Sequence, residues 1–554
     1  MSKHFNKLTM NTKVDEVPLG RYPRPLLKRN SFISLNGEWE DGIIVPYPLE
    51  SANSHFKGPV PETYTYKRTF KISSDFIKDK VLLHFGAVDA ECEVAIDNVV
   101  VGFHEGGYLP FEFDITGLVT EGKEHTLTVT VTDTLDNRLS IGKQKRKRGG
   151  MWYTPVTGIW QSVWLESVPI NYIEGLEITP YLDKISVNVY SEATDFFVKI
   201  FFKEVLIYEG HFDDSFFQIK VENPMLWTPD SPNLYDMEIS TETDIITTYF
   251  GLRTVEIGEY KGVQRILLNG QPFFFHGVLD QGYFPEGIYT PNSEYDYEED
   301  IRRLKELGFN TLRKHIKIEP ECFYEACDRL GIVVFQDMVN NGKYKFLRDT
   351  ALPTIGLQKM NDQKFKVPLA TKIAFEGAME ETLINLYNHP SIVYYTIFNE
   401  GWGQFDSDIM VSIVKAMDRT RIIDATSGWF WQEDSDVDSY HVYFKEFKLP
   451  DAKPTRPVIL SEFGGFSYKI MEHSFNLKKT YGYGKAKSSE ELTDMIVSLY
   501  EREIIPKIPL GLSGTIYTQF TDVEDETNGF YTYDRRVCKV DKNKMLELSK
   551  KLLS

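Results

Sequence analysis

The sequence predicts three parts: two antiparallel β domains, over residues 1–170 and 171–258, and a (β/α)₈ barrel over residues 259–554. From about residue 30 to 258, short runs of alternating apolar and polar residues are separated by turn signals, which is typical of antiparallel strands. After that point, short apolar strands alternate with helical segments over about 290 residues, as in a barrel of strand–helix units. A chain of 554 residues is long enough for such a division.

The two β domains are predicted from runs with clear ends. In the first domain, strands are expected at 80–85, 92–96 and 125–131, and the apolar run at 159–166 leads to a boundary near residue 170. In the second domain, strands are expected at 185–190, 197–201 and 233–239. Strands at this spacing within about 85 residues fit a small immunoglobulin-like sandwich.

The barrel is predicted from repeated strand–helix pairs. Helices are expected over 297–308 and 320–330, the second ending at Gly331. Strands are expected at 273–277, 311–314, 332–337, 392–398, 421–425, 440–443, 458–460 and 514–520.

The net charge and the cysteine content exclude several classes of partner and of metal or redox motif. With 62 Lys and Arg against 81 Asp and Glu, the net charge is −19, which argues against nucleic acid and anionic membranes as partners. Four cysteines without a C-x-x-C pair disfavour zinc ribbons and thioredoxin-like redox motifs, and so few cysteines suggest free thiols in a reducing compartment. The N-terminus has no apolar run after its lysines, and no stretch approaches the ~18 apolar residues of a membrane span. A cytoplasmic protein is therefore expected.

Two acids stand at predicted strand ends, where barrels build their active sites. Glu400 follows the strand at 392–398 and Glu462 follows the strand at 458–460. A protonated and an ionised carboxyl group facing one sugar are the requirement of glycoside hydrolysis. Each acid taken alone could equally be a solvated rim group or an ion-pair partner. The nearby side chains suit a sugar, because Trp402 and Tyr443 offer ring faces and Asn399 and His441 offer hydrogen bonds.

Other features have structural interpretations. The acidic run Asp522, Glu524, Asp525 and Glu526 is expected to be a solvated loop, as such runs usually are. A calcium site there stays open as an alternative, although the EF-hand spacing is absent. No metal and no cofactor are expected at the site.

Several segments resemble glycoside hydrolase family 2, which contains β-galactosidases, β-glucuronidases and β-mannosidases. They are residues 35–40 (LNGEWE), 85–94 (FGAVDAECEV), 101–108 (VGFHEGGY), 158–161 (GIWQ), 250–253 (FGLR), 268–272 (LNGQP), 323–331 (FYEACDRLG) and 389–400 (HPSIVYYTIFNE). The resemblance covers nearly the whole chain. It implies a jelly-roll β-sandwich for the first domain, then the immunoglobulin-like sandwich and the barrel.

The resemblance also implies roles. Glu400 corresponds to the general acid/base and Glu462 to the nucleophile of a retaining reaction through a covalent glycosyl-enzyme. Asn399 corresponds to the residue that contacts the sugar 2-hydroxyl, and Tyr443 to the tyrosine that hydrogen-bonds the nucleophile. Phe520 stands where the family often has a tryptophan on the pocket floor.

The chain departs from the family pattern in the segments that line the sugar pocket. Asp280 lies where the family has a different polar run, and we expect it to bind a sugar hydroxyl. Arg313 is followed by a Lys-His pair in place of a Ser-His-Tyr-Pro run, so His315 is the candidate for the family histidine. The loop at 528–530 lacks the lysine that reads a glucuronide carboxylate, which disfavours that sugar.

The predicted function is thus an exo-acting retaining β-glycosidase that hydrolyses small carbohydrate or glycoside substrates, with β-galactoside as the first expected sugar. β-Mannoside, β-glucuronide, arabinoside and galactofuranoside stay open as alternatives. So do an inverting mechanism and a carbohydrate-binding protein without turnover. The oligomeric state also stays open, and a homo-oligomer is one option.

Overall fold

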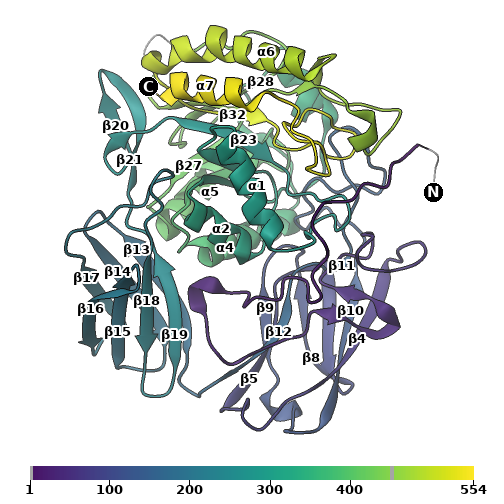
Figure 1. Ribbon diagram of the computed structural model, residues 1–554, viewed down its shortest axis with the longest axis vertical. Coiled ribbons are helices and arrows are strands. Elements are labelled where there is room, and N and C mark those ends of the chain that lie inside the picture. Colours follow the sequence, from purple (N-terminus) through teal and green to yellow (C-terminus); the bar gives the residue numbers. More distant parts are fainter. Residues whose placement is uncertain (1–3, 450–453, 554) are drawn as a thin grey trace.

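The computed structural model describes residues 4–449 and 454–553 of the chain. The barrel forms one half of the molecule, and two β-sandwiches lie side by side against it (Figure 1). Within the described residues, the helices are too short or too polar to cross a bilayer. The predicted fold class, two β-sandwiches followed by a parallel barrel, is confirmed.

The first sandwich has two four-stranded antiparallel sheets, in the orders β1-β12-β5-β9 and β4-β10-β7-β8. Alternating side chains of β10, such as Leu127, Val129 and Val131, are fully buried between the sheets. The strands of this part are β1 (Phe32–Ser34), β2 (Gly37–Glu38), β3 (Ile44–Val45), β4 (Thr63–Lys71), β5 (Lys80–Phe85), β6 (Val88–Asp89), β7 (Glu91–Ile96), β8 (Val99–Glu105), β9 (Phe111–Asp114), β10 (Glu124–Thr132), β11 (Gly158–Ile159) and β12 (Val163–Val168).

The second sandwich packs a three-stranded sheet, β13-β14-β17, on a four-stranded sheet, β16-β15-β18-β19. Arg253, which follows it, is buried and donates to backbone carbonyls of Pro390, Ile392 and Thr420, so it ties this sandwich to the barrel. The strands are β13 (Ile173–Pro180), β14 (Lys184–Ser191), β15 (Phe196–Phe202), β16 (Val205–Phe212), β17 (Phe216–Lys220), β18 (Tyr235–Ser240) and β19 (Ile245–Phe250). A small sheet joins it to the barrel: β20 (Val255–Tyr260), β21 (Val263–Leu268) and β22 (Gln271–Pro272).

Eight parallel strands form the barrel, in the order β27-β26-β25-β24-β23-β32-β29-β28. They are β23 (Phe275–Asp280), β24 (Thr311–Lys314), β25 (Val333–Asp337), β26 (Ile392–Asn399), β27 (Ile422–Ser427), β28 (Asp438–Val442), β29 (Val458–Gly464) and β32 (Leu512–Thr518). The two ends of this order, β27 and β28, meet through side chains: Ser439 donates to Asp424, and Ser427 bonds the ring of His441. The barrel therefore closes at the strand that carries His441.

Helices surround the strands, and their apolar faces pack on the barrel in one continuous core. They are α1 (Tyr295–Glu306), α2 (Glu321–Leu330), α3 (Leu352–Thr354), α4 (Leu369–Leu386), α5 (Ser407–Met417), α6 (Ser489–Leu499) and α7 (Lys542–Leu553). Two short strands, β30 (Phe466–Ser467) and β31 (Tyr483–Lys485), pair outside the barrel. The helix expected at 320–330 is α2, and it ends as predicted at Gly331, whose φ of 73° suits glycine.

A loop of the first sandwich, residues 133–157, reaches across to the barrel. The backbone N–H of Ile141 donates to the Asn340 carbonyl at 3.1 Å, and the N–H of Gly342 donates to the Asn137 carbonyl at 2.6 Å. Arg148 forms an ion pair with Glu524 at 3.0 Å on the last barrel loop. The mouth of the barrel is therefore bordered by two different domains.

Candidate active site

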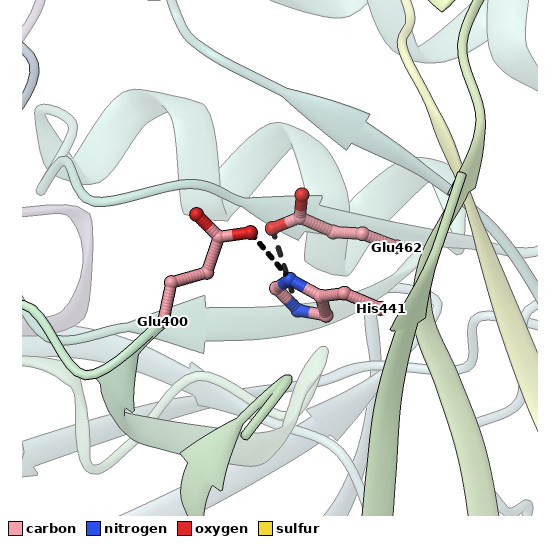
Figure 2. A group of neighbouring side chains, drawn as sticks. All are labelled: Glu400, His441 and Glu462. Carbon is pink, nitrogen blue, oxygen red and sulfur yellow. Dashed lines mark hydrogen bonds and ion pairs between the residues drawn. The ribbon is translucent and has the colours of Figure 1, made fainter. Parts of the chain in front are cut away.

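Glu400, His441 and Glu462 come from the ends of β26, β28 and β29 and converge at one end of the barrel (Figure 2). Glu400 directly follows β26 with a φ of 54°, and Gly401 follows with a φ of 70°. This left-handed pair turns the chain sharply, so the Glu400 side chain points back across the barrel mouth. His441 lies on β28 and Glu462 on β29, which pair in parallel at this position.

The imidazole of His441 lies between the two carboxylates (Figure 2). Its Nδ1 is 2.8 Å from Oε1 of Glu400, and its Nε2 is 3.6 Å from Oε1 of Glu462. One oxygen from each carboxylate lies within 4.8 Å of the other. An oxygen–oxygen gap this short is compatible with the ~5–5.5 Å that separates the carboxyl groups of retaining glycosidases.

Glu462 is buried and held as an anion. Nη1 of Arg313 donates to its Oε1 at 3.2 Å, and the hydroxyl of Tyr443 donates to its Oε2. Burial by itself would raise the pKa of Glu462. The charges of His441, His315 and Arg313 outweigh that effect and bring this pKa down to about 2.

Arg313 organises the floor of the site from β24. Its Nε donates to Asp337 at 2.8 and 3.1 Å, and its Nη2 donates to Oδ1 of Asn399 at 2.9 Å. His315 completes the group through a 2.8 Å contact between its Nδ1 and Asp337. Burial opposes the charge on Asp337, but Arg313 and His315 hold the pKa of that carboxyl below its ordinary value. The floor is thus a fully paired set of charges.

Asp337 was not predicted as a site residue. It ends β25 one polar residue after the apolar run at 333–335, as Glu462 follows Ser461 and the apolar run at 458–460, so the same strand-end criterion would have found it.

Donor atoms of Glu400, His441 and Glu462 are close enough to bind a divalent cation. The guanidinium of Arg313 contacts the same Glu462 oxygen that faces His441. A cation bound there would face Arg313 directly, and this repulsion disfavours a metal.

The remaining predicted residues lie in different surroundings. Asp280 belongs to a second buried group of charges. The Lys314 ammonium lies 2.6 Å from Asp280 and 2.8 Å from Glu319, so the Asp280 carboxylate already has a positive partner. Phe520 is fully buried in the barrel core against Tyr531. Trp402 is buried beside Glu400, and its indole N–H donates to the Gly342 carbonyl at 2.8 Å. The Tyr443 ring stacks on that of Tyr483, with centroids 4.0 Å apart.

The prediction of a solvated acidic loop at 522–526 was wrong. Asp522, Glu524, Asp525 and Glu526 are all at most 5% exposed. Lys539 neutralises Asp522 at 2.6 Å, and Arg148 of the first sandwich neutralises Glu524. These partners lie far away in the sequence or in another domain, so no local pattern could have shown the burial.

Glu526 adds a third carboxyl group, whose charge interacts with that of Glu462. Its Oε2 accepts from Gln519 at 2.9 Å, and Gln519 also donates to Asn528 and accepts from Gln281. Burial raises the pKa of Glu526 to about 7; Lys143 acts to lower it and Glu462 to raise it. These amides and Glu526 form a hydrogen-bonding wall of the kind that orients sugar hydroxyls.

Comparison with known families accounts for the whole arrangement. Three sequence models of glycosyl hydrolases family 2 match the chain: the sugar binding domain at residues 10–169, the middle domain at 172–253 and the TIM barrel domain at 259–472. The chain belongs to glycosyl hydrolase family 2.

Individual relatives are distant and carry different names. A β-galactosidase of Thermoanaerobacter pseudethanolicus is 27% identical over 73% of this chain and 54% of its own length. Human β-glucuronidase is 24% identical over 77% of this chain and 73% of its own length. The chain spans about half the length of the first of these relatives, and only 37% of the β-galactosidase of Lactococcus lactis.

Solved structures share the fold at low identity. β-Glucuronidase of Dictyoglomus thermophilum superposes with a TM-score of 0.73 at 20% identity, covering 96% of this chain and 98% of that one. A family 2 β-galacturonidase of Eisenbergiella tayi gives a TM-score of 0.67 at 18% identity, covering 98% of both chains.

Proposed function

We propose that the protein is a retaining β-glycosidase in which Glu462 is the nucleophile and Glu400 the general acid/base. The observation that carries this proposal is the short gap between the two carboxylates, with oxygens within 4.8 Å of one another. Glu462 has the depressed pKa that a nucleophile needs to remain ionised. Glu400 is less buried and therefore better placed to exchange protons with a leaving group or water.

In the first step, an oxygen of Glu462 attacks the anomeric carbon while Glu400 gives its proton to the glycosidic oxygen. The bond to the leaving group breaks, and a glycosyl ester forms on Glu462. Arg313 and Tyr443 bond the carboxylate in the free enzyme and orient it toward the sugar. His441, hydrogen-bonded to Glu400, holds that carboxyl group on the leaving-group side of the anomeric carbon, opposite the attacking oxygen of Glu462.

In the second step, Glu400 takes a proton from water, whose oxygen attacks the anomeric carbon from the side the leaving group has vacated. The ester bond to Glu462 breaks, and the sugar leaves with its original anomeric configuration. Both proton transfers use Glu400, so one carboxyl group must serve as acid and then as base.

β-Galactoside is the first proposed sugar, because two relatives that match 73% and 70% of this chain are β-galactosidases. β-Glucuronide is the second, and Lys143 favours it. Lys143 forms no hydrogen bond or ion pair through its ammonium group within the described residues, yet its charge acts on both Glu462 and Glu526. An unpaired cation at that position suits a sugar carboxylate.

A panel of 4-nitrophenyl β-glycosides tests the proposal. We expect release of nitrophenol from at least one glycoside, and a 2-deoxy-2-fluoro derivative of the same sugar should inactivate the enzyme. Peptide mass spectrometry should then find one sugar on Glu462. Preference for the galactoside or the glucuronide decides between the two sugars.

The stereochemistry and the labelled residue provide the contrary outcomes. Product NMR that shows inversion would exclude the double displacement. Sugar binding without turnover or labelling would instead support a carbohydrate-binding protein. Labelling at Glu400 in place of Glu462 would reverse the two roles.

A further inference from the structure

A cavity opens beside Glu400, on the rim of the barrel mouth. Its volume is about 280 Å³, and its lining combines three basic side chains, Lys145, Arg146 and Lys343, with the rings of Trp152, Tyr344 and Trp402. None of the described residues that line this cavity is acidic. In a chain with a net charge of −19, a pocket whose charged lining residues are all basic is unexpected.

The cavity lies on the side of Glu400. Trp402 is two residues after Glu400, and the Tyr344 hydroxyl is close enough for the charge of Glu400 to act on it. A general acid protonates the oxygen of the leaving group, so the space next to it holds the leaving group and not the sugar that stays on the enzyme.

The basic side chains of this cavity have few counter-charges. Through their ammonium groups, Lys145 and Lys343 make no ion pair or hydrogen bond with the residues that the structure describes, and the pair between Arg146 and Glu62 is largely exposed. The Lys145 ammonium lies 3.7 Å from the centroid of the Trp152 ring and 5.7 Å from that of Tyr344. These ring contacts leave its three N–H donors without an acceptor.

The rings offer a frame for a flat ligand. Trp152 and Trp402 meet edge to face with centroids 5.1 Å apart, and Trp152 meets Tyr344 at 5.0 Å. Burial and the neighbouring charge of Lys143 both lower the pKa of Lys145. Such uncompensated positive charge is relieved when an anion binds.

We propose that this rim cavity binds the leaving group and selects leaving groups that carry an anionic substituent on a ring. The ring would pack against Trp152 and Tyr344, and the anion would accept hydrogen bonds from Lys145 and Lys343. This inference rests on the proposed glycosidase function, because it names the second half of that enzyme's substrate.

The test compares two substrates that share the sugar found by the glycoside panel. One carries 4-nitrophenol and the other 3-carboxy-4-nitrophenol, and kcat/KM is measured for both. In the double variant Lys145→Gln, Lys343→Gln, the preference for the carboxylated substrate should fall about tenfold. The neutral substrate should change little, because neither lysine contacts the catalytic carboxylates. Raising the salt from about 0.02 to about 0.5 M should weaken the wild-type preference by screening.

Lys147→Gln is the matched control, since Lys147 belongs to the same basic run but is exposed and does not line the cavity. An unchanged preference in the double variant, or an equal loss in the control, would overturn the proposal. A second substrate pair, the same sugar linked to glucuronic acid or to glucose, assigns the source of the anion. Discrimination within this pair indicates an acidic sugar, and discrimination only within the aryl pair indicates an aromatic acid.

A failure of the glycosidase proposal is separable from a failure of this one. If no glycoside is cleaved, calorimetric titration with free 3-carboxy-4-nitrophenol and with 4-nitrophenol still tests the cavity. Wild-type protein should bind the carboxylated phenol more tightly, and the double variant should bind the two alike. Equal binding of the two phenols to the wild-type protein would contradict the inference, whether or not the protein cleaves glycosides.

Discussion

The floor and the rim of the barrel mouth differ in how their charged side chains are paired. On the floor, Arg313 is paired with Asp337 and Glu462, and all three are buried. On the rim, Lys145 and Lys343 line a cavity that presents no acid among the described residues. The floor is complete before substrate arrives, whereas the rim offers positive charge to a ligand.

This contrast separates two tasks. A paired and buried floor fixes the position and ionisation of Glu462, which the chemistry requires for any leaving group. An unpaired rim contributes nothing to bond breaking, but it distinguishes one leaving group from another. Changes on the floor should therefore affect all substrates alike, and changes on the rim only charged ones.

The largest effect is expected from Glu462→Gln. The amide cannot form a glycosyl ester, so turnover of every cleaved glycoside should fall by on the order of 10⁴-fold. Initial rates on the best nitrophenyl glycoside measure this. Glu503→Gln changes a buried glutamate that accepts from the Phe447 N–H and is not among the bonding partners of Glu400 or Glu462, so it should retain activity. Comparable rates in the two variants would remove Glu462 from the mechanism.

Arg313→Gln should have the next largest effect, because it leaves Asp337 buried without its cation. We expect a loss of about 3–5 kcal/mol in the free energy of unfolding by urea. The pKa of Glu462 should also rise, so the acid limb of the kcat/KM profile should move to higher pH.

Arg421→Gln is the control for Arg313→Gln. Arg421 is also buried and also pairs with an aspartate, Asp418, at 2.9 Å, but it does not bond Glu400 or Glu462. It should lose stability without moving the acid limb. If both variants shift the profile equally, Arg313 has only a structural role.

His441→Asn should give the smallest of the three effects. In the wild-type protein the pKa of Glu462 is about 2. Its carboxylate is therefore fully ionised well above pH 2 and becomes protonated only as the pH falls through that value. Without the imidazole, the two carboxylates repel each other directly, and the pKa of Glu462 rises. We expect the acid limb of kcat/KM to move upward and kcat to fall about tenfold.

His389→Asn provides the comparison for that variant, because His389 contacts Asp328 at 2.6 Å in a buried pair that the catalytic carboxylates do not touch. Its pH profile should match that of the wild-type enzyme. A wild-type profile for His441→Asn would show that His441 does not influence Glu462.

The fold, and the position of Glu400 and Glu462 at the barrel mouth, were accessible from the sequence because both depend on local order. Alternation along 125–131 predicts β10, and apolar runs that end in Glu400 and Glu462 predict two carboxylates at the barrel mouth. Burial of Glu524 was not accessible, because its partner Arg148 lies 376 residues away. Asp280, which is expected to bind a sugar hydroxyl, also forms an ion pair with Lys314 that the sequence did not indicate. Long-range pairing decides which polar residues remain available to a ligand, and a single sequence does not contain it.

The loop at 133–157 has a consequence for how such enzymes diversify. It belongs to the first sandwich, yet it supplies Lys145, Arg146 and Trp152 to the mouth of a different domain. In the proposed function, the segment that recognises the leaving group is therefore encoded apart from the residues that cut the glycosidic bond. Exchanging this one loop between relatives would retune selectivity while the catalytic barrel is inherited unchanged.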